Sequence, residues 1–144
     1  MAVVLTMGTF DLLTSGHLFL FEQCRKIAGP HGQVIVTANS DEFVHRYKGS
    51  NPVMSLDERL HMLGSLRDIS SAMVNFGDED AASVIESINP DFLVIGQDWA
   101  LKDYYGQLGI TQEWLDERDI SLIYLPRVKE LSSTELKKRI SSVS

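Results

Sequence analysis

The 144-residue sequence contains one cysteine, four prolines and no long apolar run. Cys24 has no second cysteine with which to form an intramolecular disulfide and no neighbours at metal-site spacing, so we interpret it as a small core residue. No apolar stretch is long enough to cross a bilayer, and Met1–Leu5 lacks the basic flank and cleavage site of a signal peptide. We therefore expect a cytoplasmic protein that has no membrane partner.

The sequence also lacks an excess of positive charge, because its formal net charge is −7. No basic stripe of the kind that neutralises duplex phosphates is visible, so we expect no nucleic-acid partner. Arg and Lys side chains gathered in one cleft can still bind a small anion despite a negative surface elsewhere. His31, His45 and His61 have no partners at metal-ligand spacing, which leaves a histidine-based metal site without support.

What the sequence does have is the composition of an ordinary globular protein, with 44% hydrophobic and 23% charged residues. We expect residues 1–144 to form a single domain. Five apolar runs are continuous rather than alternating, which is typical of parallel strands covered on both faces. These runs are Val3–Thr6, Val34–Thr37, Ala72–Val74, Phe92–Ile95 and Leu122–Leu125.

Helical patterns lie between and after these strands. The first carries Leu20, Cys24, Ile27 and Ala28 and stops at Gly29-Pro30. The second opens with a capping-box spacing at Ser55–Glu58. The others are marked by Ala81, Val84, Ile85 and Ile88, by Gln112–Arg118, and by Leu136 and Ile140 after a start near Ser132. This alternation predicts an α/β, Rossmann-like domain with a five-stranded parallel sheet, helices on both faces and a ligand site at the carboxyl ends of the strands.

The loop after the first strand is the main indication of function. It runs Gly8-Thr9-Phe10-Asp11-Leu12-Leu13-Thr14-Ser15-Gly16-His17 into the first helix. Gly8 can allow close backbone approach, Thr9 and Thr14 offer hydroxyls, and His17 lies where helical amides favour phosphate. The glycines lack G-x-G-x-x-G spacing and no Gly-Lys-Ser/Thr follows, so neither a dinucleotide fingerprint nor a Walker loop is present.

This loop resembles the G-x-F-D-x-x-[H/T]-x-G-H signature of the cytidylyltransferase-like nucleotidyltransferases and matches every fixed position. The resemblance continues through Lys48-Gly49, expected in a loop, Ser55-x-x-x-Arg59 and Gly96-Gln97-Asp98-Trp99. It ends with Tyr124-Leu125-Pro126-Arg127 and Ser132-Ser133-Thr134. Over nearly the whole chain it is closest to glycerol-3-phosphate cytidylyltransferases, and next to heptose-phosphate and phosphopantetheine adenylyltransferases.

The resemblance implies roles for particular residues. His17, Thr14, Lys48 and Arg127 are expected to be catalytic, with Asp11 ordering the loop or positioning a cation through water. Mg²⁺ is expected as cofactor, held chiefly by triphosphate oxygens and water rather than by protein ligands. The nucleotide-binding residues would be Gly8, Thr9, Phe10, Asp11, Gly16, Asp98, Trp99, Ser132, Ser133 and Thr134.

Two arginines are candidate ligands for the substrate phosphate. Arg59 and Arg67 are eight residues apart, and on one helix they would project from roughly the same face; together with Lys48 they are our expected substrate-binding residues. The remaining basic residues toward the end of the chain, Lys102, Lys137, Lys138 and Arg139, are interpreted as surface charge.

Three functional hypotheses follow. The first is a cytidylyltransferase that transfers CMP from CTP to glycerol 3-phosphate or a similar molecule. The second is an adenylyltransferase that uses ATP with a sugar phosphate or pantetheine phosphate, favoured by Thr14, where the glycerol-phosphate enzymes carry His, and by Lys48-Gly49. The third is a noncatalytic nucleotide-binding module, which Val128 and Glu130 in place of Thr-x-Gly would allow. The resemblance also implies a homodimer.

Overall fold

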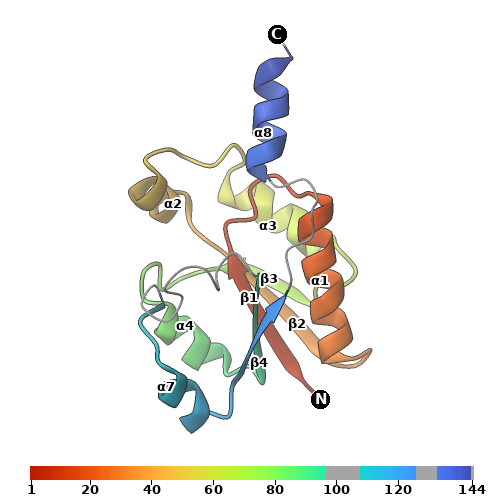
Figure 1. Cartoon of the computed structure of the whole chain (residues 1–144), viewed down its shortest axis with the longest axis vertical. Helices are drawn as coiled ribbons and strands as arrows, with labels where there is room; N and C mark the ends of the chain where they lie inside the picture. The colour runs from red at the N-terminus through yellow and green to blue at the C-terminus, as the bar shows by residue number, and fades with distance from the viewer. Residues whose placement is uncertain (97–107, 126–132, 144) are drawn as a thin grey trace.

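The fold is a five-stranded parallel sheet flanked by helices, described for residues 1–96, 108–125 and 133–143 of a computed structural model. The strand order is β3-β2-β1-β4-β5 and every neighbouring pair is parallel (Figure 1). The prediction of fold class is therefore confirmed, and all five expected strands are present. Their bounds are β1 Val3–Gly8, β2 Gln33–Ala38, β3 Ser71–Val74, β4 Phe92–Gly96 and β5 Ser121–Leu125.

Helices cover both faces of this sheet (Figure 1). Helices α1 (Ser15–Ala28) and α3 (Leu56–Gly64) pack on one face, and α4 (Ala81–Ile88) and α7 (Gln112–Glu117) on the other. Successive strand residues point to opposite faces, so neighbours separate into two cores: Val4 packs with Phe21, Cys24 and Leu63, whereas Leu5 packs with Ile85 and Leu115.

The ends of α1 and α3 show why these segments are helical. Ser55 accepts a hydrogen bond from the Glu58 amide, and the Glu58 carboxylate accepts one from the Ser55 amide, so the expected capping box is present. Helix α1 ends at Gly29, whose φ of 80° favours glycine. Cys24 is fully buried and burial raises the pKa of its thiol to about 12, which fits a core residue.

Helix α2 (Asp41–Lys48) was not expected from the sequence. Ser40 caps it by accepting a hydrogen bond from the Phe43 amide, and Gly49 ends it in the left-handed region with φ of 79°. Only Val44 is buried, so the apolar stripe is too short to stand out by periodicity. The expectation that Lys48 lies in a loop is wrong, because it is the last residue of this helix.

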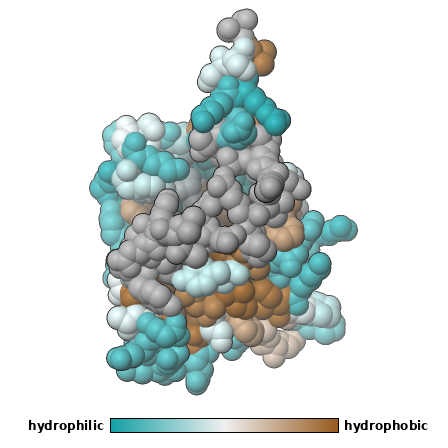
Figure 2. All heavy atoms as spheres, in the orientation of Figure 1, coloured by the Kyte–Doolittle hydropathy of each residue, from teal (hydrophilic) through white to brown (hydrophobic). Residues whose placement is uncertain are grey.

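Helix α8 (Ser133–Ser142) begins within one residue of the expected position but packs little. It extends away from the carboxyl edge of the sheet (Figure 1), and in the space-filling view it stands clear of the body (Figure 2). Ile140, one of its two apolar marker residues, is 60% exposed. No helix in the described parts of the chain combines the length and apolar character that crossing a bilayer requires.

Candidate nucleotide site

The candidate site lies where the strand order reverses. Strand β1 pairs with β2 along six residues, from Val3 to Gly8, but with β4 only at Val4 and Leu5. Beyond Leu5 the carboxyl end of β1 has a strand partner on one side only. Ligands of open parallel sheets bind in the crevice at such a reversal, so the loop that follows Gly8 is at the expected place.

Phe10 gives this loop its shape. Its backbone has a φ of 52°, and its ring is buried against Phe21, with centroids 5.3 Å apart. A Cβ built on Gly8 would lie 2.9 Å from the Phe10 ring. Gly8 is therefore needed for the approach of a side chain of this protein, whereas the sequence had suggested the approach of a ligand.

His17 is held as a neutral hydrogen-bond donor. Thr14 precedes α1, and its backbone N–H donates to Nδ1 of His17 at 3.1 Å. Because Nδ1 accepts, the proton of the neutral ring is assigned to Nε2, which can donate to a ligand. Burial lowers the pKa of His17, which favours this neutral form. Gly16 is the second residue of α1, so the helix N-terminus lies beside the ring.

Asp11 joins three segments of the chain. Its carboxylate accepts hydrogen bonds from the Val53 and Met54 amides, both at 2.8 Å, and lies 2.7 Å from Nζ of Lys137 in α8. Burial raises the pKa of Asp11, but the contacts of Lys137, Met54 and Val53 outweigh it and hold the pKa below its ordinary value. Lys137 is thus an ion-pair partner rather than the plain surface charge that we expected.

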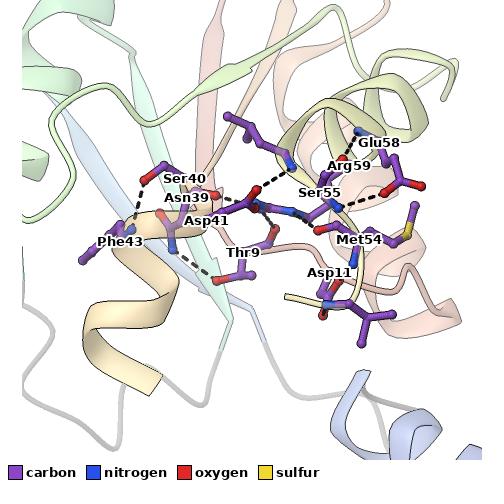
Figure 3. A network of polar contacts seen from close by, with 12 residues as sticks. Thr9, Asp11, Asn39, Ser40, Asp41, Phe43, Met54, Ser55, Glu58 and Arg59 are labelled. Atoms are coloured by element: carbon purple, nitrogen blue, oxygen red, sulfur yellow. Dashed lines mark hydrogen bonds and ion pairs between the residues drawn. The ribbon is translucent and has the colours of Figure 1, made fainter. Parts of the chain in front are cut away.

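Arg59, an expected ligand of the substrate phosphate, is buried. Its side chain is fully buried and donates to the carbonyl oxygens of Thr9, Asn39 and Met54 at 2.7–3.1 Å (Figure 3). It also pairs with the Asp41 carboxylate at 2.7 Å. Arg59 therefore ties the ends of β1 and β2 to the starts of α2 and α3, and its guanidinium is already engaged by the protein.

Arg67 does not share a helix with Arg59. Helix α3 ends at Gly64, so the expectation that the two arginines project from one helical face is wrong. Arg67 lies in the following turn and is exposed. Its role as a phosphate ligand stays a prediction. Lys48 is also exposed, with Nζ 5.7 Å from the centroid of the Tyr47 ring.

Two side chains near the first loop were missed by sequence reasoning. The Thr9 hydroxyl accepts a hydrogen bond from Nδ2 of Asn39 at 3.2 Å and lies 2.6 Å from the Tyr47 hydroxyl. Asn39 follows β2 as Thr9 follows β1, so the strand ends themselves gave a usable signal. Tyr47 gave none, because α2 was not recognised as a helix.

The second half of the expected site is only partly described. Asp98, Trp99, Arg127 and Ser132 lie outside the described residues. Ser133 and Thr134 are the first two residues of α8, and the Lys137–Asp11 contact brings this helix to the first loop. The first loop and α8, which both carry expected nucleotide-binding residues, therefore lie at one edge of the molecule (Figure 1).

Within residues 1–96, 108–125 and 133–143, no group of three or more His, Cys, Asp or Glu side chains could hold a metal ion. Asp11, the acid of the first loop, already has three donors. This donor set fits a magnesium ion carried by triphosphate oxygens and water, which stays a prediction.

Comparison with known proteins places the chain in a family. A family model described as cytidylyltransferase-like matches residues 5–139. An FAD synthase of Korarchaeum cryptofilum is 25% identical over 144 residues, covering 95% of this chain and 90% of that protein. The bifunctional protein HldE of Koribacter versatilis is 35% identical over 135 residues, and the match covers 93% of this chain but only 26% of HldE.

Among solved structures, the lipopolysaccharide core biosynthesis protein of Thermoplasma volcanium superposes with a TM-score of 0.66 at 20% identity. That superposition covers 89% of this chain and 98% of the other, so the two proteins share a fold along nearly their whole lengths. With the family model spanning both ends of the candidate site, the chain belongs to the cytidylyltransferase-like family of nucleotidyltransferases.

Proposed function

We propose that this nucleotidyltransferase is an adenylyltransferase, which transfers AMP from ATP to the phosphate of a small molecule and releases pyrophosphate. The observation that carries the proposal is the placement of His17, a neutral Nε2–H donor in the first turn of α1 at the reversal of the strand order. A helix N-terminus and a fixed donor together suit the charge of an α-phosphate.

The choice of ATP rests on a relative that matches this chain along most of both lengths, the FAD synthase of Korarchaeum cryptofilum. FAD contains an AMP unit joined to flavin phosphate through a pyrophosphate link, so its assembly from a flavin phosphate is an adenylyl transfer. The sequence resemblance, by contrast, is closest to the glycerol-3-phosphate cytidylyltransferases, which favours CTP and glycerol 3-phosphate as the substrates. That pair is retained as the second candidate, together with the sugar and pantetheine phosphates named above as acceptors for ATP.

The chemistry requires alignment more than covalent participation. An oxygen of the acceptor phosphate attacks the α-phosphorus, the new P–O bond forms as the bond to the β-phosphate oxygen breaks, and pyrophosphate leaves with that electron pair. His17 donates from Nε2 to an α-phosphate oxygen, and Thr14 fixes the ring through its backbone N–H. Bound Mg²⁺ would neutralise charge on the triphosphate.

The other proposed ligands come from later segments of the sequence. Lys48 and Arg127 would draw charge from the transferred and leaving groups, while Ser132, Ser133 and Thr134 would hold the outer phosphates at the start of α8. Asp11 supports this arrangement because it fixes the first loop and α8 to each other. The homodimer stays a prediction from the resemblance, and the cytoplasmic location stays a prediction from the composition.

One assay compares the candidates. The protein is incubated with Mg²⁺, each of ATP and CTP, and a panel of flavin mononucleotide, sugar phosphates, pantetheine phosphate and glycerol 3-phosphate. Pyrophosphate is then measured and the product is weighed by mass spectrometry. A product heavier than its acceptor by AMP supports the proposal, and a CDP-linked product replaces it with the second candidate. Nucleotide binding without pyrophosphate release would indicate the noncatalytic module.

The role of His17 has its own test. We expect His17→Ala to lower turnover by about 10²-fold or more, as for other single donors to a transition state. His31→Ala, which removes an exposed histidine outside the site, is the matched control. Circular dichroism checks that both variants remain folded. Turnover of His17→Ala equal to that of the control would refute the assignment.

A further inference from the structure

A chain of polar side chains crosses the carboxyl ends of three adjacent strands. Asn75, Asn39 and Thr9 directly follow β3, β2 and β1. Nδ2 of Asn75 donates to Oδ1 of Asn39 at 3.0 Å, and Nδ2 of Asn39 donates to the Thr9 hydroxyl at 3.2 Å. The Thr9 hydroxyl then meets the Tyr47 hydroxyl of α2 at 2.6 Å. These hydrogen bonds therefore connect the carboxyl ends of the strands to a tyrosine on α2.

The buried end of this series of side chains determines which group donates and which accepts in each hydrogen bond. Asn75 is 3% exposed, and its Nδ2 also donates to the Asp78 carbonyl at 3.2 Å, which fixes the amide orientation. Asn39 must then accept at Oδ1 and donate from Nδ2. Arg59 holds the carbonyls of Thr9 and Asn39 at 2.8 and 2.7 Å, so the backbone under the two side chains is fixed as well.

The outer end has one hydrogen atom left to donate. Thr9 and Tyr47 each carry one hydroxyl hydrogen, and one of these two hydrogens forms the bond between them. The Thr9 oxygen also accepts from Nδ2 of Asn39. Whichever hydroxyl donates in the Thr9–Tyr47 bond, the hydrogen of the other hydroxyl has no acceptor among the described residues. Tyr47 is 49% exposed, which leaves the pair within reach of a ligand.

We propose that Tyr47 is a substrate-binding residue, and that the Thr9–Tyr47 hydroxyl pair donates its remaining hydrogen to a phosphate oxygen of the substrate. This inference rests on the proposed function, because both substrates of that reaction carry phosphate. Lys48, the next residue of α2, adds positive charge beside the pair, with Nζ 5.7 Å from the Tyr47 ring. The phosphate belongs either to the nucleotide or to the acceptor.

Tyr47→Phe tests the proposal, because it removes one hydroxyl and keeps the ring that packs on Phe43 at 5.1 Å. We expect about a tenfold higher KM for one substrate with kcat nearly unchanged, the loss typical of one hydrogen bond to a charged group. Calorimetric titration with MgATP alone, and with the acceptor alone, shows which phosphate is held. A KM and binding constant equal to wild type for both substrates would overturn the inference.

Three further variants separate a loss of binding from general damage to the fold. Arg46→Gln removes the contacts of α2 with Asp78 and Glu79 but leaves both hydroxyls in place, so we expect its KM values to stay near wild type. Thr9→Val and the double variant Thr9→Val/Tyr47→Phe complete a double-mutant cycle. If the two hydroxyls act as a pair, the double variant binds the substrate hardly more weakly than either single variant. Additive losses of binding free energy would contradict this. Wild-type protein that is inactive with every substrate refutes the proposed function instead, and the calorimetric arm still reports on Tyr47.

Discussion

At the scale of single residues, the most informative side chains are polar groups whose hydrogen bonds go to this chain's own backbone. His17 accepts from the Thr14 amide, Asp11 accepts from two amides, and Arg59 donates to three carbonyls. Each contact removes freedom from the loop before a ligand arrives. Preorganisation of this kind is what phosphoryl transfer requires, since catalysis there depends on positioning.

The burial of His17 predicts how the stability of the protein depends on pH. Its pKa is lowered by burial, so the unfolded chain takes up a proton at His17 at a higher pH than the folded protein does. The contribution of neutral His17 to stability is therefore complete above the unfolded pKa of about 6.5 and declines as the pH falls below it. Protonation at Nδ1 would also break the Thr14 bond, worth about 1 kcal/mol.

Two measurements check this. Proton NMR should give His17 a pKa below the ordinary value of 6.5. Urea unfolding should show that the stability difference between wild type and His17→Ala shrinks from pH 7 to pH 5. A difference that is constant across that range would contradict the assigned burial effect.

The sequence revealed residue types here but not their surroundings. The motif predicted that Asp11 and His17 matter, and the structure places Asp11 in the first loop and His17 in the first turn of α1. It could not reveal that Arg59 faces inward, because an arginine on an amphipathic helix is usually solvated and only the three carbonyls and Asp41 make its burial tolerable. Those partners come from segments far apart in the sequence.

At the scale of helices and strands, Arg59 is the point where four elements join. Its contacts reach the residues that follow β1 and β2, the first residue of α2 and the residue before the cap of α3. The position of α2 thus depends on a side chain of α3. Figure 3 shows these groups converging on one guanidinium.

We expect Arg59→Met to destabilise the protein by about 3–5 kcal/mol, because it leaves Asp41 and the buried carbonyls without their donor. The free energy of unfolding in urea measures this. Arg46→Gln is the control, since Arg46 is exposed and its ion pairs with Asp78 and Glu79 should matter little. Similar losses of stability in both variants would mean that the buried contacts of Arg59 contribute no more than the exposed ion pairs of Arg46.

The elements with a buried face were all predicted, whereas α2, which buries one residue, was missed. All five strands and α1, α3, α4 and α7 have apolar positions that enter one of the two cores. Helix α2 buries only Val44, so its apolar pattern was too short to predict a helix. Helix α8 was predicted from Leu136 and Ile140, but the structure leaves Ile140 exposed.

At the scale of the whole molecule, alternating strands and helices were enough to predict the parallel sheet, since handedness and short connections allow few other topologies. The contact that completes the site was not predictable in the same way. Lys137 lies among Lys138 and Arg139 in a charged helix, and nothing in that run distinguishes the one lysine that reaches Asp11.

Lys137→Met should loosen the attachment of α8 to the first loop. We expect a loss of about 1 kcal/mol at pH 7, small for a charge-assisted contact because the Lys137 side chain is 39% exposed. The pKa of Asp11 is lowered in the folded state, so its contribution to stability is present above about 3.8 and lost as the pH falls through the folded pKa.

The variant should therefore differ from wild type more at pH 7 than at pH 3, measured by urea unfolding at both. Lys138→Met, which removes an exposed neighbour, should behave as wild type. A difference of the same size at both pH values would show that the lost contact is not the ion pair.

The Asp11–Lys137 contact also makes the candidate site depend on a helix in which none of the described side chains is fully buried. Loss of α8 would remove Lys137, Ser133 and Thr134 together, while all five strands and Arg59 would remain. We therefore expect a protein cleaved by a protease after β5 to bind nucleotide more weakly than the intact chain.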